Sequence, residues 1–169
     1  MKTSIQFQPD IDHLAALGTQ IEWRDINGAE AGTVLLMPHK DGAPVHYHPV
    51  QEEQFLVLQG TLQVYRGKEW VTLKAGESIS IPKQTPHTYK NTSGEMVLFD
   101  FCITPRVRFK EMIGAMDAFV RQGKIKGSDF RSVLYLSRVM AAYPDVTQSV
   151  APPQFMVKAL AALSKLMFK

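Results

Sequence analysis

The chain has 169 residues and a formal net charge of +3, with 45% hydrophobic and 21% charged residues. These values are typical of a soluble protein with a substantial core, and the length suits one domain with an appendage. The absence of low-complexity runs and of repeats with a solenoid period excludes repeat architectures. The single cysteine, Cys102, excludes an internal disulfide.

The first residues of the sequence carry no targeting signal. Residues 1–7 hold one lysine and then mixed polar residues, without the apolar run of a signal peptide. No stretch reaches the roughly 18 consecutive apolar residues that cross a bilayer. We therefore expect a cytoplasmic protein, with Cys102 as a buried small hydrophobe in an apolar run.

The charge is unevenly distributed along the chain. Residues 1–104 hold 8 basic and 12 acidic residues, whereas residues 105–169 hold 11 basic and 4 acidic ones. This asymmetry predicts two parts with different surfaces. We expect a β-barrel with its N-terminal segment at residues 1–104, and a helical extension at residues 105–169 that packs on the barrel or on a partner.

Before residue 105 the pattern is that of β-structure. Short runs of Val, Ile, Leu, Phe and Tyr are separated by glycine-containing turns, and no helical pattern interrupts them. Many short strands at even spacing favour a jelly-roll barrel. The expected strands are Ile21–Ile26, Thr33–Met37, Val45–His48, Gln54–Leu58, Leu62–Tyr65, Trp70–Leu73, Ser78–Ile81, His87–Lys90 and Val97–Ile103.

After residue 105 the spacing becomes helical. Met112, Met116 and Phe119 form an i, i+4, i+7 stripe, and Gly123 predicts the end of this first helix. Ser128 is the expected cap of a second helix at 130–142. Two prolines at 152 and 153 then open a third helix at 155–168.

Two histidines and a glutamate form the strongest chemical signal. His46 and His48 are two residues apart on an expected strand, so their side chains point the same way. Glu53 follows one short turn later, and His87 begins a strand after a proline-marked turn. Three imidazoles and one carboxylate suit a single divalent ion such as Fe, Mn, Zn, Ni or Cu.

These segments resemble the two signature motifs of the cupin superfamily. The first motif pairs His-x-His with a later Glu and Gly, and it matches at His46, His48, Glu53 and Gly60. The second matches at Gly76, Pro82, His87 and Asn91. The chain departs at Gly42, which is separated from His46 by three residues where the pattern has five, and at Gln84, where the pattern has Gly. The resemblance covers about Thr33 to Ile103 and implies a small single-domain cupin of the type-2 conserved-barrel kind with a C-terminal helical extension.

The motif spacing also selects the carboxylate. Glu52 and Glu53 are neighbours on a strand and face opposite sides, and the six-residue gap to Gly60 favours Glu53. We therefore expect His46, His48, Glu53 and His87 as metal ligands, whereas His13 and His39 are expected to be ordinary histidines.

The surroundings of the ion are predicted from strand parity. Phe55 and Val57 should face inward with Glu53, and Tyr89 should do so with His87. Which residues face inward stays open on two further strands. On the strand at 97–103 they are either Phe99 and Phe101 or Leu98 and Asp100. On the strand at 33–37 they are either Leu35 and Met37 or Val34 and Leu36. Tyr89 is the candidate catalytic residue because it is the polar group in a largely apolar pocket.

The sequence leaves the activity open. An apolar barrel around an open metal site is similar to that of O₂-dependent dioxygenases, which would act on a small, partly apolar organic molecule. A non-catalytic ligand-binding or scaffolding cupin is the alternative, because fold does not determine function. The family resemblance also implies a homodimer, in which unpaired strand edges associate.

The last helix has a broad apolar face. Its narrow polar stripe is formed by Gln154, Lys158, Ala161, Lys165 and Lys169. Packing on the barrel or on a partner subunit is one interpretation. Association of residues 152–169 with an anionic membrane surface is another. We expect no nucleic-acid binding, because no known motif is present.

Overall fold

Antiparallel strands occupy most of the chain before residue 105, and helices follow. The computed structural model describes residues 7–168, apart from the side chains of residues 14 and 15. The first sheet has the order β1 (Ile11–His13), β2 (Thr19–Ile26), β3 (Ala29–Leu36), β11 (Val97–Thr104), β6 (Glu52–Gln59) and β9 (Ser78–Ile81). The second has the order β12 (Gln148–Ser149), β5 (His46–Tyr47), β10 (His87–Asn91), β7 (Thr61–Arg66) and β8 (Glu69–Lys74), and β4 (Lys40–Asp41) also pairs with β10.

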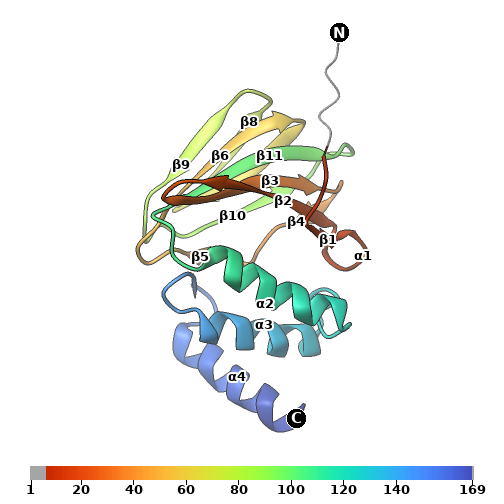
Figure 1. Ribbon diagram of the computed structural model, residues 1–169, viewed down its shortest axis with the longest axis vertical. Helices are drawn as coiled ribbons and strands as arrows, with labels where there is room; N and C mark the ends of the chain where they lie inside the picture. Colours follow the sequence, from red (N-terminus) through yellow and green to blue (C-terminus); the bar gives the residue numbers. More distant parts are fainter. Residues whose placement is uncertain (1–6, 169) are drawn as a thin grey trace.

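The two sheets face each other and enclose an apolar interior, which makes a jelly-roll barrel (Figure 1). Alternation along β6 produces this arrangement, because Phe55 and Val57 are buried whereas Gln54 and Leu56 are exposed. On β11 the interior set includes Phe99 and Phe101, so the alternative with Asp100 inward is wrong.

The expected strands are confirmed, with boundaries shifted by a few residues. On β3 the interior residues are Val34 and Leu36, and this strand begins earlier than predicted, at Ala29. Three strands of two or three residues were not predicted, because β1, β4 and β12 are too short to show a periodicity. The expectation that no helix precedes residue 105 is wrong, because α1 (Leu14–Leu17) forms a single helical turn there.

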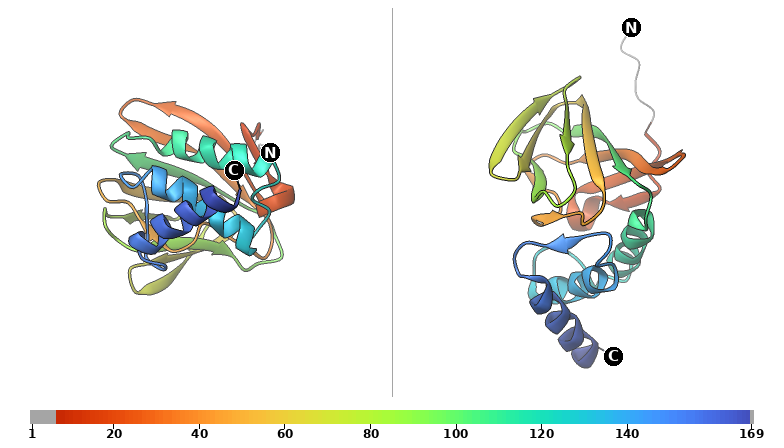
Figure 2. Two further views of the ribbon diagram at one scale, coloured as in Figure 1. Left: turned by 90° about the horizontal axis from the view of Figure 1, so that it is seen from below. Right: turned by 90° about the vertical axis from the view of Figure 1, so that its left-hand side faces the viewer.

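Three helices follow residue 105, as predicted, and they form a layer at one end of the barrel (Figure 1). They are α2 (Phe109–Arg121), α3 (Phe130–Ala142) and α4 (Gln154–Met167). Figures 1 and 2 show α2 beside the barrel and α4 farthest from it. Gly123 follows α2 with a φ of 64°, a conformation that favours glycine.

The cap of α3 differs from the prediction. Asp129, and not Ser128, occupies the N-cap, and its Oδ1 accepts a hydrogen bond of 3.1 Å from the backbone N–H of Ser132. Both residue types cap helices well. Only the backbone conformation of residue 129, which is extended, decides between them.

The start of helix α2 is capped by a residue of strand β3. Glu30 on β3 is buried, and its carboxylate accepts hydrogen bonds from the backbone N–H groups of Val107, Phe109 and Lys110, at 3.2, 3.0 and 2.7 Å. These are N–H groups that a helix cannot satisfy internally. Glu30 therefore joins the barrel to the first helix.

The last helix packs on α3 through a narrow face of Val157, Ala161 and Ser164. This corrects the placement of Ala161 on the polar stripe. Large apolar side chains of α4 are exposed instead, with Phe155 and Leu166 each 72% exposed. Lys169 and residues 1–6, which entered the sequence predictions, lie outside the described residues. Among the described residues, no helix has the length and hydropathy needed to cross a bilayer.

Candidate metal centre

His46 and His87 face each other on two paired strands. His46 on β5 is the register partner of His87 on β10, and their ring centroids are 4.4 Å apart. His48 follows β5 directly and is buried, whereas His46 remains partly exposed. One side of the site is thus built by the second sheet.

The opposite sheet contributes the carboxylate. Glu53 lies on β6 and is buried, with Oε2 at 2.8 Å from Nε2 of His87 and at 3.6 Å from Nε2 of His48. One ligand atom from each of His46, His48, Glu53 and His87 can be chosen so that all four lie within 4.8 Å of one another. The structure therefore brings together the four residues that the sequence singled out. Glu52 points away and accepts a hydrogen bond of 2.7 Å from Ser80 Oγ.

Each histidine is oriented by a backbone carbonyl. Nδ1 of His46 donates to the oxygen of Pro44 at 2.8 Å, that of His48 to Val146 at 2.7 Å, and that of His87 to Thr85 at 2.9 Å. Because a carbonyl oxygen can only accept, each Nδ1 carries a proton, and in the neutral imidazole each Nε2 is left with a lone pair.

These lone pairs fit a divalent cation. The Nε2 atoms of His48 and His87 are buried and make no hydrogen bond among the described residues, although Oε2 of Glu53 lies 3.6 and 2.8 Å from them. Unpartnered buried nitrogens are unfavourable unless another group satisfies them. Three neutral imidazoles and one carboxylate are a donor set that transition metals accept, and carbonyl-bonded histidines are usual around such ions.

The protonation states of His46 and Glu53 agree with this fit, whereas the neighbouring Glu53 carboxylate raises the pKa of His48 despite its burial. Burial, together with the nearby His87 and His48, lowers the pKa of His46 to about 3, so this imidazole is neutral near pH 7. Burial raises the pKa of Glu53, but the close approach of His48 and His87, which favours the ionised carboxylate, outweighs it and holds the pKa well below its usual range. A neutral imidazole and an ionised carboxylate are the forms that bind a metal ion.

Aromatic rings fill the barrel beside the cluster. Tyr89 packs edge-on against Phe99 and Phe55, with ring centroids 5.0 and 5.7 Å away. A side chain at Gly42 would overlap the Tyr89 ring, so glycine is needed there. Tyr89 is thus the hydroxyl-bearing residue in a largely apolar wall.

Gln84, which stands where the second cupin motif has glycine, keeps the backbone conformation of a glycine. Gln84 adopts a φ of 63°, the left-handed conformation that glycine would adopt at this position. Its backbone N–H donates to the oxygen of His48 at 2.8 Å. The turn that glycine usually forms is therefore retained, and it contacts a residue of the cluster.

Sequence reasoning missed one contributor, Val146. Its carbonyl oxygen comes from the segment after α3, and every residue type carries such an oxygen. No side-chain pattern could have indicated it. The two histidines expected to be ordinary lie outside the cluster: His13 bonds Asp117 on α2 at 2.7 Å, and His39 is exposed.

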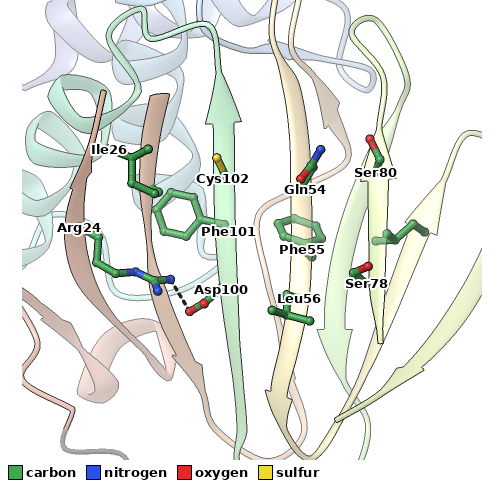
Figure 3. Close-up of a pocket in the computed structure, with 12 residues that line it drawn as sticks. Arg24, Ile26, Gln54, Phe55, Leu56, Ser78, Ser80, Asp100, Phe101 and Cys102 are labelled. Atoms are coloured by element: carbon green, nitrogen blue, oxygen red, sulfur yellow. Dashed lines mark ion pairs between the residues drawn. The ribbon is translucent and has the colours of Figure 1, made fainter. Parts of the chain in front are cut away.

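A shallow pocket of about 470 Å³ lies on the outer face of the first sheet, away from the four clustered residues. Figure 3 shows its lining, including the ion pair of Arg24 with Asp100 and the thiol of Cys102. The expectation that Cys102 is buried is wrong, because it faces this outer side and is partly exposed.

Comparisons with known proteins agree with this architecture. The model of the Cupin_2 family, a cupin domain, matches residues 32–104. The uncharacterised protein YdbB of Bacillus subtilis is 46% identical over 43 residues, which are 25% of this chain and 38% of that protein. The polyketide synthase CurC of Streptomyces cyaneus is 31% identical over 80 residues, which are 46% of this chain and 52% of that protein. The matches thus span about half or less of these curated relatives.

Two solved structures share the fold. A sugar phosphate isomerase of the cupin superfamily from Silicibacter pomeroyi has a TM-score of 0.51 at 20% identity, covering 56% of this chain and 63% of that one. The cupin domain of Cnp3 from Schizosaccharomyces pombe has a TM-score of 0.50 at 16% identity, covering 62% and 74%. Together with the family match and the barrel, these findings show that residues 32–104 of this chain form a cupin domain.

Proposed function

We propose that His46, His48, Glu53 and His87 bind one divalent metal ion. The observation that carries this proposal is the convergence of three imidazoles, each held by a carbonyl at Nδ1, on one buried carboxylate. Iron, manganese, zinc, nickel and copper all accept this mixed set of nitrogen and oxygen donors.

We further propose that the metal centre is that of an oxygenase for a small, partly apolar organic molecule. A bound ion would supply Lewis acidity and a binding site for O₂. Phe55 and Phe99 offer an apolar wall beside the cluster. Tyr89 is the residue that would orient the substrate through its hydroxyl. The match to a polyketide synthase supports small, partly apolar test compounds.

The oxygenase proposal is tested by oxygen consumption. Protein loaded with Fe(II), Mn(II), Ni(II) or Cu(II) is assayed with small aromatic and diketone compounds. We expect turnover with at least one metal, a rate reduced in Tyr89→Phe, and an unchanged rate in Glu52→Gln, which lies on the outer side of the same strand. Absence of oxygen consumption with every metal and compound contradicts the oxygenase proposal.

A non-catalytic cupin is the alternative, in which the ion is structural and the barrel holds a ligand. The two differ in whether the ion keeps a position open to water. Water-proton relaxation of the Mn(II)-loaded protein measures this directly. Fast relaxation by exchanging water supports catalysis, whereas its absence together with tight ligand retention supports the binding module.

A second candidate function is attachment to an anionic membrane surface through α4. Phe155, Leu166 and Met167 are exposed on this helix, and the helix contains lysines but no acidic residue. An apolar face with basic neighbours binds anionic lipid by burial and charge together. The test is co-sedimentation with vesicles that contain phosphatidylserine, beside vesicles of phosphatidylcholine alone.

The variant Leu166→Asp should abolish vesicle binding. Leu56→Asp is the matched control, because Leu56 is also an exposed leucine but lies on the outer face of the barrel. Equal binding by Leu166→Asp and the unmodified chain, or no binding by the unmodified chain, contradicts membrane attachment.

We also propose that the chain forms a homodimer through its terminal strands. β8 and β9 are the last strands of their sheets, and unpaired strand edges favour association. Light scattering should give twice the chain mass of 19.0 kDa. A mass of one chain at all concentrations contradicts the dimer.

A further inference from the structure

The segment between α3 and α4 returns to the barrel and contacts the strand that carries His46. We call residues 143–149 the returning segment. Its strand β12 pairs with β5, with Ser149 opposite His46 and Gln148 opposite Tyr47. The Tyr47 hydroxyl donates to Oε1 of Gln148 at 2.8 Å. Figure 2 shows this segment between the helices and the barrel.

The returning segment also supplies the carbonyl that orients His48. Nδ1 of His48 donates to the oxygen of Val146 at 2.7 Å, across 98 residues of sequence. His46 and His87 differ in this respect, because each bonds a carbonyl only two residues earlier. The orientation of His48 therefore depends on docking of the extension, whereas the other two form with their own strands.

The acceptor is held firmly. Val146 is fully buried in the main core, and Asp145 beside it accepts hydrogen bonds of 2.6 and 3.2 Å from the guanidinium of Arg108. Tyr143 donates from its hydroxyl to Glu111 at 3.1 Å. These contacts connect the returning segment to α2 as well as to the core.

The contact lies outside the part of the chain that the family model matches. The family match ends at residue 104, and the returning segment begins 39 positions later, at residue 143. Hydrogen-bond partners of metal-bound histidines typically contribute 10–100-fold to metal affinity, because they determine the tautomer and the direction of the lone pair. The extension therefore contributes to the cluster geometry.

On the basis of the proposed metal site, we propose that the returning segment is a positioning element of that site. Metal binding and docking of the helical extension are then coupled. Because such coupling is reciprocal, the docked extension raises metal affinity and the metal stabilises the docked extension by the same factor.

Hydrogen exchange of the unmodified full chain, with and without Co²⁺, tests the coupling. We expect the metal to slow amide exchange in the barrel and also in the returning segment and α3. Protection confined to residues 32–104 would overturn the proposal. This measurement uses no variant, so it does not depend on whether a variant folds.

Two matched variants test the positioning role. Val146→Ala and Val139→Ala remove the same two methyl groups from the same buried core, but only Val146 bonds His48. Val146→Ala keeps the carbonyl oxygen but removes the packing that holds it, so we expect this variant to weaken Co²⁺ binding by more than about twofold and to change the visible absorption of the bound Co²⁺. Val139→Ala should stay within about twofold of the unmodified chain. Equal affinities in the two variants would contradict positioning.

The outcomes separate this inference from the proposed function. If the unmodified chain binds Co²⁺ through the four residues but shows no protection beyond residue 104 and no difference between the two variants, the coupling is wrong and the metal site stands. If the unmodified chain binds no Co²⁺, both fail together.

Discussion

His46 and His87 are register partners on antiparallel strands, and their rings lie with centroids 4.4 Å apart. Each donates its Nδ1 hydrogen to a carbonyl two residues earlier, of Pro44 and Thr85. The two motifs therefore meet at one site, with an equivalent histidine from each, although they are far apart in sequence. Glu53 closes the site from the opposite sheet.

Removal of the carboxylate should reduce metal affinity. Glu53→Gln replaces an ionised oxygen donor by a neutral amide, and we expect Zn²⁺ affinity to fall by at least about 100-fold, the upper end of the effect of an outer partner. Isothermal titration calorimetry measures the change. Glu52→Gln is the control and should bind as the unmodified chain does. A loss of affinity in Glu52→Gln, with Glu53→Gln unaffected, would show that the ligand is Glu52 and not Glu53.

Glu30 should contribute strongly to stability. Glu30→Ala leaves three N–H groups at the start of α2 without their acceptor, and we expect a loss of about 2–4 kcal/mol in the free energy of unfolding. Urea denaturation measures it. Glu69→Ala, on an exposed strand position, should change the value by less than about 0.5 kcal/mol. Similar losses in both variants would show that Glu30 does not cap the helix.

The cap of α3 can be tested by two neighbouring variants. Asp129→Ala removes the side chain that bonds Ser132, and we expect a loss of about 1 kcal/mol. Ser128→Ala should have an effect below about 0.5 kcal/mol. Thermal and urea unfolding of both proteins decide the question, and the reverse order would favour the cap first expected from the sequence.

Acid should remove the contribution of the ion pair between Asp145 and Arg108. The hydrogen bond from Arg108 lowers the pKa of the Asp145 carboxyl. Because the pKa in the folded state is below its unfolded value of about 3.9, the contribution is present above that pH and is lost as the pH falls through the folded pKa.

The pair is partly exposed, so its contribution is at most about 1 kcal/mol. Asp145→Asn should therefore be less stable than the unmodified chain at about pH 7, and the difference should shrink as the pH falls below about 3.9. Urea midpoints of both proteins at the two pH values measure this. A difference that persists at low pH would contradict the assignment.

Local patterns predicted most of the barrel and the four clustered residues. Strand parity places His46 and His48 together, and motif spacing distinguishes Glu53 from Glu52. The inward set on β11 stayed open because this strand is apolar on both faces. Burial of Leu98 beside Phe99 shows why alternation alone was insufficient.

Contacts between distant segments could not be predicted. Val146 acts through a backbone oxygen and Glu30 caps a helix that begins far along the chain, and neither leaves a local signature. The apolar residues of α4 outnumber those its narrow buried face can hold, so composition could not show which are exposed. The division into residues 1–104 and 105–169 stays a prediction, which limited proteolysis near residue 105 can test.

The metal content of the protein, purified without added metal and then reloaded, tests the central claim most directly. Elemental analysis should find about one divalent ion per chain, and none in the double variant Glu53→Ala, His87→Ala, which lacks two of the proposed ligands. The same metal content in the double variant, or no metal in the unmodified chain even after reloading, would contradict the account.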